Sequence, residues 1–367
     1  MFPRPNNSER KQIARAIFGD DNRWDDIATK AYFDHYFSIL CPETPGDAVI
    51  NIEIPALRGH TDVTRCVDVL RQDPFLSFDE FVVKATGSEQ VNSKEKEYIA
   101  DLTVDIKFMF KCYLKDYHSV GLKGHDLGWV KWEKNVRFTD FTKEAFTRQL
   151  VTTEEQKYKN ADTIRNKKHL KAWKLKRRYG ITIRPTDNLL EHLSYDPSTR
   201  ILKVFHQHFF LRTQLELTKD SPLDLGFEDS LKLGTLPPKL LLETLLTFHV
   251  LFPIKTVGDK KSHSSLKRMI KKYNFDPETE IISFVRPVPS DMVFEYWGDR
   301  LTKLYDTVKR PPPTNPIVSW FERHTSERNA LTAAILGLFL AALFGFLSFV
   351  VGLLQLILAW VAWKHPN

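Results

Sequence analysis

Cysteine is scarce in this sequence. The 367 residues include only three cysteines, Cys41, Cys66 and Cys112, and these stand far apart. An odd number at wide spacing indicates neither a disulfide framework nor a zinc ribbon, and free thiols are typical of a reducing compartment. Glycine and proline are also sparse, at 15 and 20 residues, which excludes a collagen-like or low-complexity chain. The composition therefore predicts a globular protein of a reducing compartment.

Signatures of catalysis and of cofactor binding are also missing. The glycine-rich run Gly121–Gly128 has neither the Lys-Ser/Thr ending of a phosphate-binding loop nor the spacing of a dinucleotide fingerprint. His125-Asp126-Leu127 lacks the Asn and the Asp-Phe-Gly that complete a kinase catalytic loop, and no Gly-x-Ser-x-Gly elbow surrounds a serine. We therefore predict no catalytic residue, cofactor or metal, and lean against an enzyme.

One group of histidines could be imagined as metal ligands. His206 and His208 lie close in sequence to Glu191 and His192. On a helix, side chains two residues apart point to nearly opposite sides, so only a strand would let both histidines bind one ion. Because apolar residues surround them on both sides, we favour a structural role for these histidines.

Charge is absent from the C-terminal segment Ala330–Trp363, which spans 34 residues. A run of roughly 18 or more apolar residues is typical of a transmembrane helix. At about 1.5 Å per residue the run would be roughly 51 Å long, against a hydrocarbon core of about 30 Å. Two solutions stay open: one span with an overhang, and a hairpin that turns near Gly345–Ser348.

Small residues recur at every fourth position of this segment. They are Ala333, Gly337, Ala341 and Gly345. Such a stripe lets another helix approach closely and predicts self-association, or packing of two hairpin arms. The high glycine and alanine content that is usual in membrane helices would also explain it.

Positive charge flanks the hydrophobic segment unequally. Lys309, Arg310, Arg323 and Arg328 precede it, and only Lys364 follows it. The positive-inside rule therefore predicts that residues 1–328 lie in the cytosol. The first ten residues contain no hydrophobic signal region, which agrees with this orientation. The membrane that holds the protein is not indicated.

The sequence divides into four parts. Residues 1–310 predict a cytosolic, mainly α body with minor β, for which a subdivision near 150–185 stays open. Residues 311–328 form a proline-rich linker and a juxtamembrane helix, 329–363 the membrane segment and 364–367 a short tail. Spacing and capping signals predict helices at 8–18, 25–40, 61–71, 77–85, 93–117, 240–251 and 295–308, and strands at 49–54 and 280–285. Around Trp129 and Trp132 we favour a loop or half-buried strand anchored by tryptophan over an exposed interaction surface.

One segment carries most of the positive charge. Glu154–Arg184 contains eleven basic and three acidic residues, a net +8, whereas the whole chain is +7. A helix over 163–179 would place Ala172 and Leu175 on one side, with Leu170 and Trp173 on the basic side. A solvated helix face, an anionic lipid surface and nucleic acid all fit such a segment. The candidate residues for an anionic surface are Lys167, Lys168, Lys171, Trp173, Lys174, Lys176, Arg177 and Arg178.

Four runs of sequence carry a family resemblance: TDNLLEHL at 186–193, ILKVFH at 201–206, LPPKLLLET at 236–244 and SERNALT at 326–332. With them the chain resembles a group of filamentous-fungal, C-terminally membrane-anchored proteins of unknown function. The resemblance covers about residues 120–367. It implies a fungal source and a membrane-anchored product, and it transfers no catalytic residue.

These observations lead to one hypothesis and two alternatives. We hypothesise a non-enzymatic, membrane-anchored adaptor whose cytosolic body binds lipid headgroups or protein partners. The alternatives are a membrane-bound enzyme with an unfamiliar site and a body that binds nucleic acid. The enzyme alternative predicts a deep pocket with at least two converging polar side chains.

Overall fold

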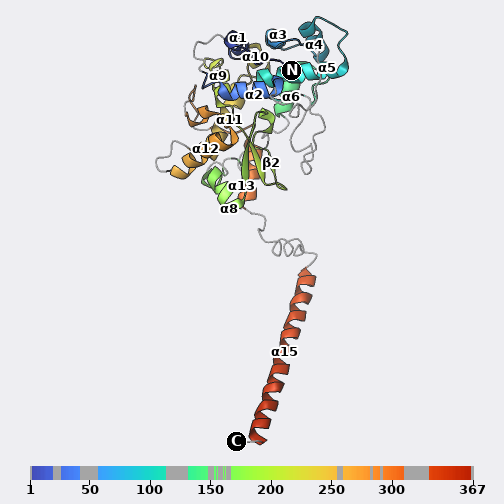
Figure 1. Ribbon diagram of the computed structural model, residues 1–367, viewed down its shortest axis with the longest axis vertical. Coiled ribbons are helices and arrows are strands. Elements are labelled where there is room, and N and C mark those ends of the chain that lie inside the picture. The colour runs from blue at the N-terminus through green and yellow to red at the C-terminus, as the bar shows by residue number, and fades with distance from the viewer. Residues whose placement is uncertain are drawn as a thin grey trace. The chain divides into compact units, whose positions relative to one another are not determined.

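The computed structural model describes residues 2–19, 26–41, 57–112, 131–147, 153, 155, 160, 162, 167–253, 259–281, 284–289, 292–309 and 330–364. In the last range the side chains are described for 337–360 and for 364. The predicted strand at 49–54, the glycine-rich run at 121–128 and the linker at 311–328 lie outside these residues. The chain separates into two units, Met1–Val308 and Lys309–Asn367. The first, which we term the body, is mainly helical with a small sheet (Figure 1), so the predicted fold class is confirmed.

Helices form the first half of the body. They are α1 (Asn7–Phe18), α2 (Lys30–Leu40), α3 (His60–Gln72), α4 (Phe78–Thr86), α5 (Ser93–Phe108) and α6 (Phe138–Thr147). Capping boxes fix two of the starts, because Glu9 accepts the backbone N–H of Asn6 and Glu80 that of Ser77. The helix predicted at 8–18 thus begins at Asn7 with Asn6 as its cap, and the helix predicted at 25–40 begins at Lys30.

Helix α5 ends well before the predicted residue 117. Met109 adopts a left-handed conformation with φ of 55°, and Phe108, Met109 and Phe110 are all buried. A residue with positive φ cannot continue a right-handed helix, so α5 ends at Phe108. Asp101 accepts the N–H of Cys112 at 2.9 Å and holds the departing chain.

The sheet lies where no strand was predicted. Its strands are β1 (Thr182–Thr186), β2 (Tyr195–Asp196) and β3 (Ile201–Phe205), in the order β1-β3-β2, with β1 parallel and β2 antiparallel to β3. The strand predicted at 280–285 is wrong over its described part, because Glu280 ends a 3-10 helix, η4 (Pro277–Glu280), and Ile281 is not in a strand. Asp276 caps η4 by accepting the N–H of Glu278 at 2.9 Å.

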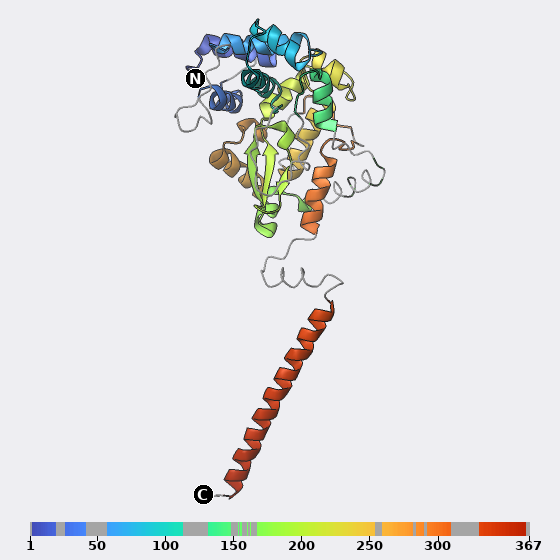
Figure 2. The same ribbon diagram turned by 90° about the vertical axis from the view of Figure 1, so that its right-hand side faces the viewer.

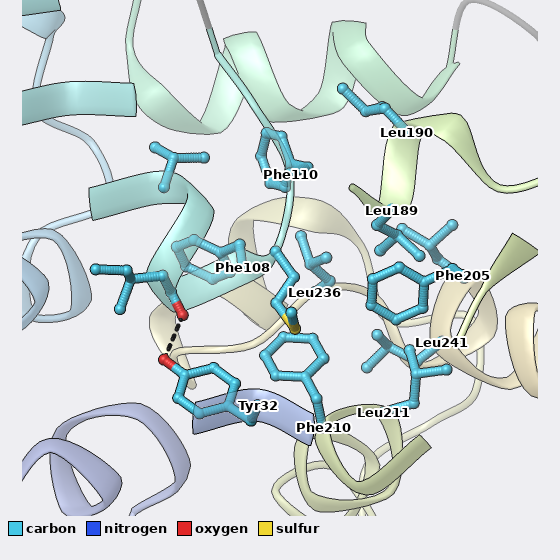
Figure 3. Packing of buried hydrophobic residues seen from close by; sticks show 14 of the residues in the cluster. Tyr32, Phe108, Phe110, Leu189, Leu190, Phe205, Phe210, Leu211, Leu236 and Leu241 are labelled. Carbon is cyan, nitrogen blue, oxygen red and sulfur yellow. Dashed lines mark hydrogen bonds between the residues drawn. The ribbon is translucent and has the colours of Figure 1, made fainter. Parts of the chain in front are cut away.

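The second half of the body adds further helices around this sheet. They are η2 (Lys167–His169), α8 (Ala172–Tyr179), η3 (Leu189–Glu191), α9 (His208–Glu216), α10 (Phe227–Lys232), α11 (Pro238–Leu251), α12 (Lys260–Tyr273) and α13 (Gly298–Lys309). One hydrophobic core joins the two halves. Figure 3 shows Tyr32 and Phe108 from the first half packed near Phe205, Phe210 and Leu241 from the second. The Tyr32 hydroxyl donates to Ile106 O at 2.9 Å within this core.

The two ends of the body differ in content. Helices α1, α3, α4 and α5 gather at one end, and the sheet, α8 and α13 lie at the other (Figures 1 and 2). The C-terminal end of α13, from which the chain leaves the body, is at the same end as α8 in both views. Helix α8 and the exit of the chain are therefore at one end of the body.

The second unit contains one long helix, α15 (Ala330–Lys364), of 35 residues. It is continuous through Gly345–Ser348, where a hairpin would have to turn. Within it, the 24 residues Gly337–Trp360 are long and apolar enough to cross a membrane. The structure thus has one continuous helix, and not a hairpin, over Ala330–Lys364.

Candidate functional site: a basic face on two helices

The predicted helix over 163–179 is not continuous. Over its described part, the chain forms the single turn η2, passes through Leu170 and Lys171, and starts again as α8. Leu170 is completely buried, contrary to its predicted place on the basic side, because the break turns it into the core. Gly180, in a left-handed conformation with φ of 67°, ends α8.

Helix α8 presents its charges outward. Ala172 and Leu175 are buried against the body, whereas Lys176, Arg177 and Arg178 are exposed. Lys167 and Lys168 of η2 are exposed as well. The structure thus gathers the candidate residues along one stretch of surface. Lys171 differs from the others because its ammonium pairs with Asp259.

A second basic helix, α12, completes this surface and was missed by the sequence analysis. Asp259 caps its start by accepting the N–H of Ser262 at 3.1 Å, and Leu266 and Met269 are buried. Its exposed residues include Lys260, Lys261, Lys267, Arg268, Lys271 and Lys272. The signal was present in the sequence, since 260–273 holds six bases, no acid and apolar residues at helical spacing.

Helices α8 and α12 pack against each other. We term the basic residues of 167–179 and 260–273 the basic face. Together with Asp259 these two stretches hold thirteen lysines and arginines and one acid, a formal +12. The whole chain is only +7, so the remainder sums to −5. The positive charge of this protein is therefore concentrated on two adjoining helices.

Trp173 lies where the two helices meet. Lys261 Nζ is 5.0 Å from the centroid of its ring and Lys174 Nζ is 5.5 Å from it, both within the range of a cation–π interaction. Burial and the charges of Lys174, Lys168 and Arg178 lower the pKa of His169. Burial and the charges of Arg178 and Lys171 likewise lower the pKa of Lys174. Burial is the largest cause of both shifts, and the neighbouring like charges add to it.

The histidines that could have bound a metal are structural. His206 Nε2 contacts Asp187 at 3.1 Å while its Nδ1 accepts the N–H of Asp276 at 2.9 Å. His192 is fully buried and bonds Thr247 at 2.8 Å. His208 opens α9 and packs edge-on against Phe248. Across the described part of the chain, no three acidic, histidine or cysteine side chains gather closely enough to hold a metal ion.

A partly buried ionic cluster surrounds Asp187, whose side chain is 35% exposed while those of His35 and His206 are 7% and 6% exposed. Its carboxylate contacts His35 Nδ1 at 3.3 Å and His206 at 3.1 Å, and Gln207 donates to it as well. His35 Nε2 contacts Asp105 at 3.2 Å, so the ring must carry both protons to donate to two carboxylates. Burial alone would lower the pKa of His35, but Asp105 and Asp187 outweigh it and raise the pKa to about 10. Each charge here has a partner, and neither histidine has a free nitrogen to act as a base.

An open cavity of about 360 Å³ lies between α4, α5 and the loop at 131–136. Trp132, which is buried and donates to Val136 O at 2.7 Å, forms part of its wall, as expected for a tryptophan anchor. Four of the six charged groups in its lining form two ion pairs: Lys96 with Asp79 at 3.2 Å and Lys131 with Glu97 at 3.1 Å. The lining contains no histidine or cysteine, but it includes Ser93 and Glu133.

The three cysteines are buried and free. Burial raises the pKa of Cys66 to about 11 and that of Cys112 well above its ordinary value. Both are therefore neutral thiols near pH 7, and the thiolate that a nucleophilic cysteine needs is disfavoured.

One face of α15 is free of large side chains. At about 100° per residue, a sector of about 80° contains only small or polar residues between 337 and 359. They are Gly337, Ala341, Gly345, Ser348, Gly352, Gln355 and Ala359. Every leucine, isoleucine, valine and phenylalanine of this stretch lies outside the sector. The predicted stripe of small residues thus continues along the whole span.

Comparison with known protein families, with curated proteins and with solved structures found no match for this chain.

Proposed function

We propose that this chain is a non-enzymatic, membrane-anchored adaptor whose body lies in the cytosol and binds anionic lipid headgroups through the basic face. The observation that carries the proposal is the concentration of a formal +12 on two adjoining helices of a chain that is otherwise −5. A basic residue near an anionic bilayer contributes about 1 kcal/mol, so a few engaged residues suffice for binding. The kinship with the fungal group stays a prediction from the sequence runs.

The anchor and the basic face can act on the same bilayer. Residues 310–329 separate α13 from α15, and 20 extended residues reach at most about 70 Å. The chain leaves the body at the end that carries α8 (Figures 1 and 2). Tethering raises the effective concentration of lipid at the basic face, so even a weak contact becomes occupied. The cytoplasmic leaflet is the anionic one, which fits the predicted orientation.

The test uses residues 1–309. The described core of the body contains no residue beyond Val308, so this fragment keeps its complete core. We expect it to co-sediment with phosphatidylcholine vesicles that contain phosphatidylserine, and to dissociate as salt rises, because the Debye length falls from about 10 Å at 0.1 M to about 3 Å at 1 M. If the fragment does not bind anionic vesicles at low salt, the basic face is only a solvated surface and the proposal is overturned.

A matched pair of variants locates the interaction. Replacing Lys260, Lys261, Lys267 and Arg268 by glutamine removes four charges from α12, and the same change at Lys11, Lys84, Lys219 and Lys232 removes four charges from the rest of the body. Only the first set should abolish sedimentation. Equal loss with both sets would mean that net charge, and not the basic face, attracts the body. Preference for duplex DNA over vesicles would favour the nucleic-acid alternative instead.

Orientation has its own test. Protease added to intact microsomes that carry the full chain should digest the body, because residues 1–328 are proposed to face the cytosol. Protection of the body would reverse the orientation and remove the basis for binding to the cytoplasmic leaflet.

Self-association through the predicted stripe Ala333, Gly337, Ala341 and Gly345 also stays a proposal. The continuation of the small sector to Ala359, with the polar Ser348 and Gln355 inside it, supports close helix packing. Gly345→Leu should reduce cross-linking of the full chain in bilayers, and Leu347→Ala, outside the sector, should not. If Gly345→Leu does not change cross-linking, the small residues have no role in self-association and reflect only the usual composition of membrane helices.

A further inference from the structure

Charge is distributed unevenly within the basic face, with its tightest cluster around Trp173. Lys174 Nζ donates to Lys168 O at 2.7 Å, which draws this ammonium back over the η2 turn. Lys261 Nζ reaches the same tryptophan ring from α12, at 5.0 Å from the centroid. Asp259 is paired with Lys171, and its charge also acts on Lys174. Lys168, Lys174 and Lys261 make no ion pair with any described carboxylate.

The electrostatics of this cluster agree with its geometry. The charges of Lys174, Lys168 and Arg178 all act on His169, and those of Arg178, Lys171 and Lys168 on Lys174. Cations that are held together repel one another in the free protein, and a bound anion relieves the repulsion from all of them at once. The start of α8 adds to the attraction, because no side chain caps its first turn and the positive end of the helix dipole lies there.

We propose that Lys168, His169, Lys174, Arg178 and Lys261 form a binding site for the clustered phosphate groups of a phosphoinositide-type lipid headgroup. This inference rests on the proposed function and names its ligand. A phosphomonoester carries a charge of about −1.5 to −2 and three acceptor oxygens. Lysines bind such groups as point charges, and Arg178 can donate two N–H groups to one phosphate. A phosphatidylserine headgroup offers neither this charge density nor several phosphates that could engage both helices.

The experiment compares two lipids at equal surface charge. Residues 1–309 are mixed with vesicles that carry either phosphatidylserine or a bisphosphorylated phosphoinositide, the two adjusted to the same electrophoretic mobility. We expect at least tenfold tighter binding to the phosphoinositide vesicles. Equal binding to both would overturn the headgroup site and leave the proposed function standing, whereas binding to neither would overturn both.

Two double variants separate the site from the general attraction. Lys174→Gln with Arg178→Gln should remove the preference for the phosphoinositide, while Lys267→Gln with Arg268→Gln should weaken binding to both lipids by the same factor. Each pair removes two charges from the basic face, and Lys267 and Arg268 are exposed on α12. If both pairs weaken the two lipids in parallel, no specific cluster exists and the proposal fails.

A last arm distinguishes a lipid headgroup from a free phosphate compound. Soluble inositol trisphosphate should compete for the site, but more weakly than the vesicle binds, because the vesicle also engages the rest of the basic face. If the soluble compound binds and phosphoinositide vesicles do not, the assignment to a lipid is overturned.

Discussion

The body holds two concentrations of charge that are built in opposite ways. Around Asp187, polar side chains from α2, from α5 and from the residues that follow β1 and β3 meet at a partly buried position, and each contacts a partner of opposite charge or a hydrogen-bonding group. On the basic face, the stretches 167–179 and 260–273 bring together thirteen lysines and arginines, and only Lys171 forms an ion pair with a described carboxylate. The charges of the first cluster are paired within the body. Most cations of the second have no described ion-pair partner, and we propose that an external anion binds them.

This difference separates structural charge from functional charge. A buried charge is costly unless it is paired, so the ions around Asp187 tie together elements that are far apart in sequence. Exposed, unpaired cations cost little and contribute little to stability. Substitutions should therefore affect stability in the first region and binding in the second.

The largest effect is expected on the basic face. Changing Lys174, Lys176, Arg177 and Arg178 to glutamine removes four charges worth about 1 kcal/mol each at an anionic surface, which corresponds to roughly a thousandfold loss of vesicle partitioning. The melting temperature of residues 1–309 should stay within about two degrees of the parent. Sedimentation and thermal unfolding measure the two quantities on one sample. A large drop in melting temperature would show that these cations also hold the fold.

The reverse outcome is expected for Asp187→Asn. The amide cannot carry the charge that His35 and His206 contact, and hydrogen bonds to charged groups contribute about 1.5–3 kcal/mol. We expect the free energy of unfolding to fall by about 2–3 kcal/mol in urea titrations, with unchanged vesicle binding of the folded protein. Asp220→Asn, at an exposed position, is the control and should cost almost nothing. Equal stability of the two variants would contradict a structural role for the cluster.

Lys107 sharpens the comparison because it is a buried cation without a carboxylate partner. It is 1% exposed, donates to Ile17 O at 2.7 Å, and burial together with Arg71 lowers its pKa to about 7. Between that pH and the ordinary lysine value of 10.5 the unfolded chain binds the additional proton, so stability should rise with pH in this window. Lys107→Met should remove this contribution, at most about 1.4 kcal/mol per pH unit.

Urea titrations of both chains at pH values from about 7 to 10 measure that slope. Two parallel stability profiles would mean that Lys107 stays charged in the folded body. Lys84→Met, at a half-exposed lysine of α4, serves as the control and should keep the profile of the parent.

The smallest effect is expected for His169. Its pKa is lowered by burial and by Lys174, Lys168 and Arg178, so it gains its proton at a lower pH than an ordinary histidine. One added charge near an anionic surface is worth about 1 kcal/mol, or about a fivefold change in binding. Lowering the pH from about 7.5 to 5.5 should therefore favour vesicle binding of the parent by about that factor over His169→Gln. Identical pH profiles would place His169 outside the interface.

Local signals predicted some parts of this protein well. The capping pattern at Ser77 and Glu80 marked the start of α4, and Pro237-Pro238 marked that of α11, because these residues act on their immediate neighbours. The candidate residues of α8 were named from their charge alone. By contrast, α12 was not predicted, although its basic residues and its apolar residues at helical spacing form an equally clear pattern. The strands β1 to β3 were not predicted because apolar and polar residues alternate too little in them.

Other features depended on contacts between distant residues. Three features depend on packing in the folded body: the break of the helix at Leu170, the end of α5 at Met109, and the contacts of Asp187 with His35 and His206. A short stretch of sequence cannot predict them, because it does not contain the distant residues that these positions contact.

The sequence by itself determined the membrane helix, the mainly α class and the existence of one basic segment, because apolar length, helical spacing and net charge are properties of consecutive residues. Only the tertiary structure decided that residues 260–273 join 167–179 in one surface, that Lys171 is neutralised by Asp259 and that Trp173 lies between Lys174 and Lys261. Packing of α8 against α12 brings together residues almost ninety positions apart, and it adds Lys261 to the cations that 168–178 already holds.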